Sequence, residues 1–372
     1  MIDAGGEGWG VPSLPGVLNP LVPRPLLPRP LRIPLLVLGA LALGALGLGG
    51  RAHADVRDGP PVVVALGDSA ASGEGAGDYE PGTRGEGGDW CHRSPAAYVH
   101  RTTLGSGVDL ACSGAGTAHV ALGAAVHHTE GSQAARLAEV ARRHRVTTVT
   151  VQVGANDDPD LSGTAVACIR AFLDPREPGC RHSLGPGWAG RLAAVAPRIE
   201  GAVRDVRGAM GSAGYTEADY TLVLLSYAAP GSEAMPAWHA VQGCPYSRPD
   251  AGWIRTEAFP RLTETIGAVA ERTGARFLDL TRLAEGREAC TGTLRDEWQR
   301  RLTVDPRSLV QGTLGAAGMR LFQESFHPTA AGHGAIAGCL SEFVRSAAPR
   351  AACLPARDGL AHPVPTPRGV AA

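Results

Sequence analysis

Short apolar runs alternate with longer amphipathic segments along most of the chain. Four runs rich in β-branched and aliphatic residues have the length and composition of buried strands, and they cover 62–66, 146–153, 220–226 and 276–280. Three segments repeat apolar residues at helical spacing, and they cover 132–144, 192–210 and 256–274. This alternation predicts the α/β class, a three-layer α/β/α sandwich with a mostly parallel central sheet.

Small and polar residues follow directly after the first predicted strand. Gly67, Asp68 and Ser69 end the run VVVAL, and a turn is the simplest interpretation because these residues are ordinary turn formers. The alternative is a nucleophile presented at the carboxyl end of a parallel strand, where α/β folds place their sites. The rest of the chain decides between the two.

The amino-terminal segment has the pattern of an export signal. Three arginines precede the apolar run 33–50, and Ala52-His53-Ala54 has the small-x-small pattern of a cleavage site. We therefore expect 1–54 to be a leader and signal peptide, and the protein to be secreted. A membrane anchor through 33–50 is the alternative, since that run approaches the length that spans a bilayer.

Residues 55–352 are expected to form one domain, and 353–372 a disordered tail that is too rich in proline to pack. The chain is 44% hydrophobic and 19% charged, so a sizeable core can form. Its formal net charge of −1 gives no basic surface for nucleic acid, and no nucleic-acid partner is expected.

Eight cysteines in a chain that is expected to be exported indicate disulfides. None belongs to a C-x-x-C pair, which argues against a zinc ribbon or a thioredoxin-like site. Eight cysteines allow many pairings, and we expect neighbours along the sequence to pair. The expected pairs are Cys91–Cys112, Cys168–Cys180, Cys244–Cys290 and Cys339–Cys353.

Several other residues could carry chemistry but have simpler interpretations. His119, His127 and His128 lack a spaced set of acidic or cysteine partners, so we expect neither a metal nor another cofactor. We expect Asp68 to fix the turn beside Ser69, and His333 to lie on a helix surface. Four tryptophans are candidates for a substrate cleft or for the core: Trp90, Trp188, Trp238 and Trp253.

Four short blocks follow one another along the chain. They are Gly67-Asp68-Ser69, the turn 111–115 (ACSGA), the strand end 153–157 (VGAND) and the segment 324–333 (ESFHPTAAGH). In this order they resemble the SGNH, or GDSL-type, hydrolase family, which is named after its Ser, Gly, Asn and His. The contexts CHRS and LACSGA make the chain most similar to the secreted bacterial esterases and lipases of that family. The G-x-S-x-G motif of the rival α/β-hydrolases is absent from the sequence.

The resemblance implies a role for each of these residues. Ser69 would be the nucleophile and His327 its general base, because a serine hydroxyl needs a base within hydrogen-bond reach. The oxyanion hole would consist of the backbone N–H groups of Ser69 and Gly114 and the side-chain amide of Asn156.

The group that orients the histidine departs from the family pattern. Most members carry Asp three residues before the histidine, and this chain carries Glu324 there. We take Glu324 as the third catalytic residue, which would orient His327. A backbone carbonyl near Ser325 is the alternative, and it would leave a Ser–His dyad.

Together these residues predict a secreted serine hydrolase that cleaves carboxylic esters through an acyl-enzyme, as an esterase or lipase. A carbohydrate-active esterase such as a deacetylase is one alternative, and a non-catalytic binding module on the same fold is another. We expect a small-molecule or lipid ester substrate, no obligate protein partner and a monomer. The segment 227–253, with its Gly, Pro and Trp residues, is expected to shape the choice of ester.

Overall fold

The computed structural model describes residues 58–304 and 322–367. In this part of the chain seven strands form one sheet in the order β2-β1-β3-β4-β5-β6-β7. Neighbouring strands run parallel, except that β7 is antiparallel to β6. The strands are β1 Pro61–Gly67, β2 Ser106–Asp109, β3 Arg145–Gln152, β4 Thr221–Leu225, β5 Arg276–Asp279, β6 Arg350–Pro355 and β7 Ala361–Pro365. The mostly parallel sheet expected from the sequence is confirmed.

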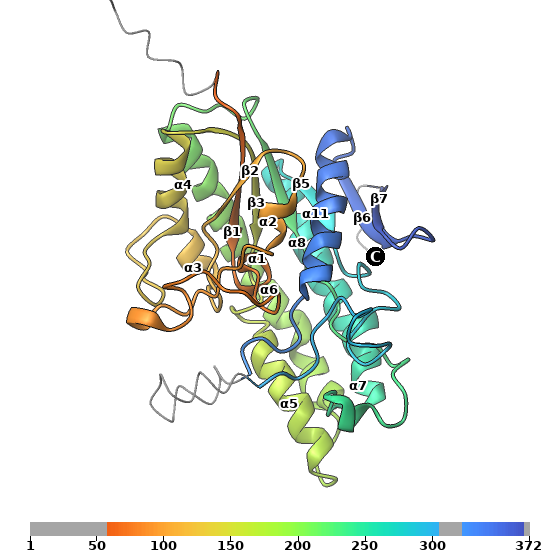
Figure 1. Ribbon diagram of the computed structural model, residues 1–372. Helices are drawn as coiled ribbons and strands as arrows, with labels where there is room; N and C mark the ends of the chain where they lie inside the picture. Colours follow the sequence, from red (N-terminus) through yellow and green to blue (C-terminus); the bar gives the residue numbers. More distant parts are fainter. Residues whose placement is uncertain (1–57, 305–321, 368–372) are drawn as a thin grey trace, which may run out of the picture. The chain divides into compact units, whose positions relative to one another are not determined.

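Helices lie on both sides of the sheet (Figure 1). The longer ones are α4 Gln133–Ala141, α5 Leu161–Leu173, α6 Cys180–Ser212, α8 Phe259–Thr273 and α11 Ala330–Arg345. Shorter ones are α1 Ser69–Ser72, α2 Tyr98–Arg101, α3 Thr117–Val120 and α7 Arg248–Trp253, and the π-helical turn Ile254–Ala258 joins α7 to α8.

The side chains of β1 point alternately into two apolar layers. Val62, Val64 and Leu66 pack with residues of α4, α6 and α8. Val63 and Ala65 pack with residues of α2 and α11 on the other face. Because both faces are covered, the strand reads as an unbroken apolar run rather than as an alternating one. The predicted three-layer α/β/α sandwich is confirmed.

All eight cysteines lie in the described residues, and they form the four pairs that were expected. The disulfides are Cys91–Cys112, Cys168–Cys180, Cys244–Cys290 and Cys339–Cys353. The second of them joins α5 to the start of α6, and the fourth joins α11 to β6. Cys91–Cys112 and Cys339–Cys353 therefore brace the sheet side of the domain and its last helix. Cys168–Cys180 and Cys244–Cys290 brace the region around α5 to α7.

The expectation of a disordered tail from 353 onward is wrong for residues 353–367. Arg350–Pro355 form β6 and Ala361–Pro365 form β7, so the chain completes the sheet here. The prolines of β7 are tolerated because it is an edge strand, where a missing N–H breaks no ladder. Composition alone favoured disorder because it does not reveal that β6 pairs through 350–352 with β5, some 70 residues upstream, and through 351–355 with β7.

His333 does not lie on a helix surface as expected, but is fully buried in the first turn of α11. Its Nδ1 accepts the Tyr98 backbone N–H at 3.3 Å, and its ring stacks on the Tyr98 ring. Burial lowers the pKa of His333 to about 3, so the ring is neutral. Apolar spacing along α11 could not reveal this, because α2 supplies the covering surface.

Other expectations fall partly outside the described residues. The predicted leader and signal, 1–54, and the alternative anchor, 33–50, lie outside them, as does the chain end at 368–372. Within 58–304 and 322–367 no helix has both the length and the apolar character to cross a bilayer. Of the four tryptophans, Trp90, Trp188 and Trp253 are buried in the core and Trp238 is exposed.

The pairing of β6 with β5 and β7 predicts slow hydrogen exchange in a strand whose last residues, 353–355, composition marks as disordered. The amides of 351–354 should exchange at least about 100-fold more slowly than those of Arg357 and Asp358 in the turn that follows, because the ladder must open first. Exchange followed by mass spectrometry on the intact, oxidised protein measures both segments in one experiment. Equal and rapid exchange in both would contradict the place of β6 in the sheet.

Candidate active site

The end of β1 lies so close to β3 that residue 67 has no room for a side chain. A Cβ on Gly67 would lie 2.0 Å from the Gln152 carbonyl oxygen, and Gly67 has a φ of +144° that suits glycine. The Gln133 side chain bonds both polar groups of Gly67, accepting its N–H at 2.7 Å and donating to its carbonyl at 2.8 Å. The close contact with Gln152 and the two hydrogen bonds to Gln133 therefore fix the point where the chain leaves the sheet.

Asp68 begins the turn that presents Ser69. Its carboxylate accepts the Ala70 backbone N–H at 3.0 Å, which caps α1, and the Tyr227 hydroxyl at 2.6 Å. Burial raises the pKa of Asp68 to about 7. The turn-fixing bond expected for Asp68 is confirmed, and Ser69 follows as the first residue of α1.

Ser69 and His327 meet although 258 positions separate them along the chain. Ser69 Oγ lies 2.7 Å from His327 Nε2, and the opposite ring nitrogen, Nδ1, lies 2.9 Å from the Ser325 carbonyl oxygen. Because a carbonyl only accepts, Nδ1 must carry the hydrogen, and Nε2 is left to accept the hydrogen of the Ser69 hydroxyl. The ring is therefore in the tautomer that can take a proton from Ser69.

The expectation that Glu324 orients His327 is wrong, and the carbonyl alternative is the arrangement found. Glu324 Oε2 lies 3.8 Å from Arg300 Nη1, while the Ser325 carbonyl occupies the ring nitrogen. A tight turn explains this arrangement. Phe326 adopts a φ of +64°, which brings the carbonyl of Ser325 against the ring of His327. The spacing of residue types in a motif contains no information on such a backbone turn.

Sequence reasoning missed Glu74 as a residue of this site. Its fully buried carboxylate lies 2.9 Å from His92 Nδ1 and accepts the Tyr79 hydroxyl at 3.0 Å. The next residue packs on the histidine, since a Cβ on Gly75 would lie 2.8 Å from His327 Cβ. A carboxylate between two glycines, five positions after the serine, was the available signal.

Burial and charge act in opposite directions on His327. Burial lowers the pKa of His327, while the negative charge of Glu74 and the hydrogen bond to the Ser325 carbonyl raise it, and the net pKa lies below the ordinary 6.5. For Glu74, burial raises the pKa, but the His92 ring outweighs it and the net pKa is lowered. Near neutral pH the site thus holds a neutral imidazole with a buried carboxylate behind it.

The residues expected to form the oxyanion hole come together around one cavity. Ser69, Gly114 and Asn156 all line it, together with His327. Gly114 has a φ of +82°, and its N–H makes no hydrogen bond within the described part of the chain. Asn156 donates one N–H of its amide to the Ala115 carbonyl at 3.1 Å, which aligns the amide and leaves its second N–H available.

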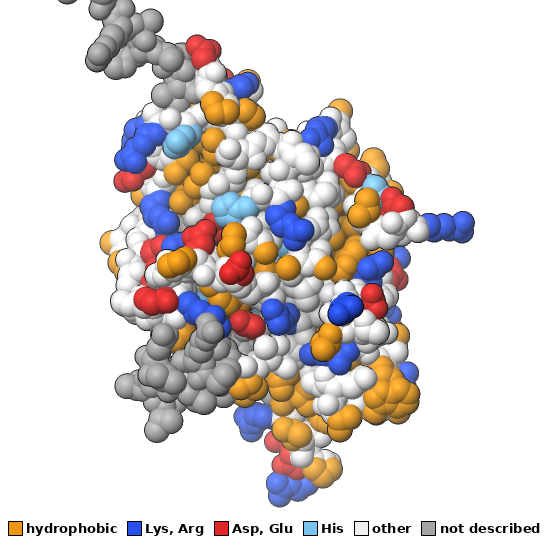
Figure 2. Space-filling view, in the orientation of Figure 1, with side chains coloured by type: hydrophobic (Ala, Val, Ile, Leu, Met, Phe, Trp, Pro, Cys, Tyr) orange, Lys and Arg blue, Asp and Glu red, His pale blue; other side chains and the backbone are white. Residues whose placement is uncertain are grey.

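The cavity beside Ser69 has a volume of about 480 Å³ and mostly apolar walls. Its size is in the range of pockets that enclose an organic ligand. Residues of α5 form one wall, and residues of the α7–α8 region and the segment before α11 form the others: Leu161, Ala165, Ile169, Tyr246, Ile254, Phe259, Phe326. Apolar side chains also gather on the surface around α5 and α7 (Figure 2), where Leu173 is 69% exposed.

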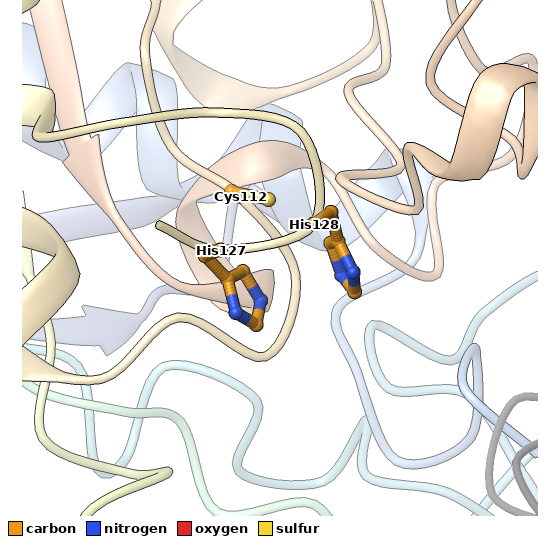
Figure 3. Close-up of side chains that lie close together, drawn as sticks. All are labelled: Cys112, His127 and His128. Carbon is orange, nitrogen blue, oxygen red and sulfur yellow. The ribbon is translucent and has the colours of Figure 1, made fainter. Parts of the chain in front are cut away.

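Two clusters of potential metal ligands adjoin the site, and both include Cys112. Figure 3 shows His127 and His128 projecting from one segment beside the Cys112 sulfur. That sulfur is bonded to Cys91, so it cannot act as the thiolate that metals bind. His127 also uses Nε2 on the Ser113 carbonyl, at 2.8 Å. Neither cluster therefore has a typical ligand set.

Comparisons with known proteins found similar solved structures. The chain is similar to the crystal structure of phospholipase A1 from Streptomyces albidoflavus NA297, at 23% identity over 73% of this chain and 94% of that one, with a TM-score of 0.49. It is also similar to an extracellular lipase from Streptomyces rimosus, at 20% identity over 73% and 94% of the two chains, with a TM-score of 0.48. A carbohydrate acetylesterase family member from Sinorhizobium meliloti is 16% identical over 77% and 97%, with a TM-score of 0.36.

No curated protein sequence matches the chain at a significant level. The model of the GDSL-like lipase/acylhydrolase family matches residues 65–335, a stretch that begins within β1 and ends within α11. It contains the serine turn, the two oxyanion-hole candidates and the histidine. The chain belongs to the GDSL-like lipase/acylhydrolase family.

Proposed function

We propose that this protein is an exported, serine-dependent carboxylic ester hydrolase of the lipase type, with Ser69 as nucleophile and His327 as general base. One observation carries the proposal: a hydrogen-bonded chain runs from Ser69 Oγ through both ring nitrogens of His327 to the Ser325 carbonyl, at 2.7 and 2.9 Å. A buried, neutral histidine in this tautomer is suited to accept the serine proton.

Acylation begins when Ser69 Oγ attacks the ester carbonyl carbon and its proton passes to His327 Nε2. The carbonyl oxygen becomes an oxyanion, which accepts the N–H groups of Ser69 and Gly114 and the free N–H of the Asn156 amide. The intermediate collapses when the carbon–oxygen bond to the alcohol breaks and His327 returns the proton to the departing oxygen. An ester of the acyl group with Ser69 remains.

Deacylation repeats these steps with water. Water gives a proton to His327 Nε2 as its oxygen attacks the acyl carbon, and the proton returns to Ser69 Oγ when the carboxylic acid leaves. In both halves the histidine passes through an imidazolium. The Ser325 carbonyl accepts its Nδ1–H, and the buried charge of Glu74 stabilises it through the low-dielectric interior.

The cavity favours an ester with a long acyl chain. Its apolar walls extend from the serine along α5, and each methylene that leaves water there contributes about 0.8 kcal/mol. The exposed apolar surface around α5 suits a substrate that is part of a lipid aggregate.

A deacetylase is the second candidate, because the same catalytic groups serve any ester. An acetyl group would leave most of the 480 Å³ unfilled, which is why we favour the longer acyl chain. A non-catalytic module would have no use for the bond between Ser69 and His327. Export is supported by the four disulfides, which persist in oxidising compartments.

Removing the charge of Glu324 should have little effect on turnover. Glu324→Gln should change kcat by less than about threefold, because the Ser325 carbonyl keeps the ring oriented. Ser69→Ala, which removes the attacking oxygen, should lower kcat by about 10⁴-fold or more. Both are measured on one short-chain ester after circular dichroism has verified folding. A loss of about 100-fold in Glu324→Gln would return that residue to the catalytic set, and an active Ser69→Ala would refute the proposed function.

The lowered pKa of His327 predicts where activity declines in acid. The base must be neutral to work, and burial makes it release its proton below pH 6.5, so kcat/KM should rise through a midpoint below 6.5. Asp68, with a pKa of about 7, is a second titrating group beside Ser69. Asp68→Asn removes that group, and the acidic midpoint should persist in it. A midpoint at or above 6.5 in this variant would contradict the environment described for His327.

Filling the cavity should shift the preference of the protein toward short esters. On p-nitrophenyl esters from acetate to palmitate, kcat/KM should increase with acyl length, and Ala165→Phe should lower it at least about tenfold for the long chains while acetate changes less than about threefold. Ala171→Phe, on the same helix but away from the cavity lining, is the matched control. A maximum at acetate in the wild type, together with release of acetate from acetylated sugars, would favour the deacetylase instead.

A further inference from the structure

In the peptide group between Ser113 and Gly114, the carbonyl makes a hydrogen bond, whereas the N–H makes none within the described residues. Its carbonyl oxygen lies 2.8 Å from His127 Nε2, while its N–H, on Gly114, makes no hydrogen bond within the described residues. The carbonyl and N–H of a trans peptide point in opposite directions from one rigid plane. A ring that holds the carbonyl therefore also sets the direction of the N–H.

The nature of this bond identifies His127 as the donor. The carbonyl oxygen of Ser113 can only accept, so His127 Nε2 must carry a hydrogen. Residue 114 also has to be small here, because a Cβ on it would lie 3.2 Å from His127 Nε2, tighter than ordinary contact. The imidazole thus lies directly against the loop that offers Gly114 to the cavity, which both residues line.

The segment that carries His127 is itself held in place. His127 and Glu130 exchange two backbone hydrogen bonds, at 2.8 and 2.9 Å. The Glu130 carboxylate accepts Arg93 Nη1 at 3.0 Å, and the same Nη1 donates to the Ala111 carbonyl at 3.2 Å. The turn with His127 and the loop that leads to Gly114 are therefore tied to one guanidinium, which limits their relative movement.

We infer that His127 is a positioning residue of the oxyanion hole, acting through the Ser113–Gly114 peptide group. The inference rests on the proposed function, because it takes Gly114 N–H as a donor to the oxyanion. When negative charge develops on the substrate oxygen, the Gly114 N–H bond strengthens, the Ser113 carbonyl becomes a better acceptor and its bond to His127 strengthens in turn. Such a chain stabilises the transition state more than the bound ester.

The test compares side chains that can and cannot supply the donor. His127→Gln places an amide N–H at about the reach of Nε2, His127→Asn is too short, and His127→Phe keeps the ring without a donor. We expect kcat to fall about tenfold or more in the Asn and Phe variants, with KM within about twofold, and to stay within about threefold of wild type in the Gln variant. Val126→Ala, on the same segment but at an exposed side chain outside the cavity lining, is the control and should stay within about twofold.

A second readout separates positioning from a merely structural role. A boronic acid forms a tetrahedral adduct with Ser69 that places an oxygen where the oxyanion forms, so its inhibition constant should rise by the same factor as kcat falls. Wild-type kcat in His127→Asn and His127→Phe would overturn the inference, as would equal losses in the Gln and Asn variants. If the Asn or the Phe variant does not fold, the other still compares no donor with the donor of the Gln variant. If the Gln variant does not fold, the wild type supplies the donor for the comparison. Activity that survives Ser69→Ala would instead refute the proposed function, so the two failures are distinguishable.

Discussion

The site depends on the contact between Gly67 and the backbone of β3. A residue with any side chain at 67 would collide with the Gln152 carbonyl, and the chain could not leave β1 in its present direction. The same glycine is bonded through both polar groups to Gln133, and its carbonyl also accepts the Cys112 N–H at 3.1 Å. One point of close packing therefore locates the serine turn and the loop that leads to Gly114 relative to each other.

In this structure, one group orients the His327 ring and a different group supplies the negative charge near it. In the common triad a single carboxylate both orients the ring and neutralises the imidazolium. Here the Ser325 carbonyl orients the ring, and the negative charge comes from Glu74, which lies behind it in a buried pair with His92. Separating the roles is physically reasonable, because orientation needs a directed bond whereas a charge acts over several ångströms in a low dielectric.

The cavity is built outside the sheet by segments that disulfides hold together. Cys168–Cys180 and Cys244–Cys290 lie in one buried cluster with Met235, Tyr246 and Ala251, and this cluster backs the wall that contains Tyr246. In the proposed function, Ser69 follows β1 and the two other oxyanion-hole candidates follow β2 and β3, and these groups would suit any ester. On the proposed function, selectivity for the acyl chain rests with α5 and the region around α7, which can vary without disturbing the sheet.

The sequence by itself determined the class of fold, because alternating apolar runs and helical spacing are local signals. It also predicted the cysteine pairs, from the expectation that neighbours along the sequence pair, and four candidate site residues, from short motifs. Apolar runs identify strands, and short motifs place Ser69, Gly114, Asn156 and His327 at the ends of elements. Features that depend on contacts between segments far apart in the sequence were decided only by the tertiary structure. β6 forms because β5 offers it a free edge, His333 is buried because α2 covers it, and the Ser325 carbonyl reaches His327 because Phe326 turns the chain. The roles assigned to Glu74 and His127 likewise follow from their contacts in the folded structure, since the effect of a charge or hydrogen bond depends on the neighbouring groups.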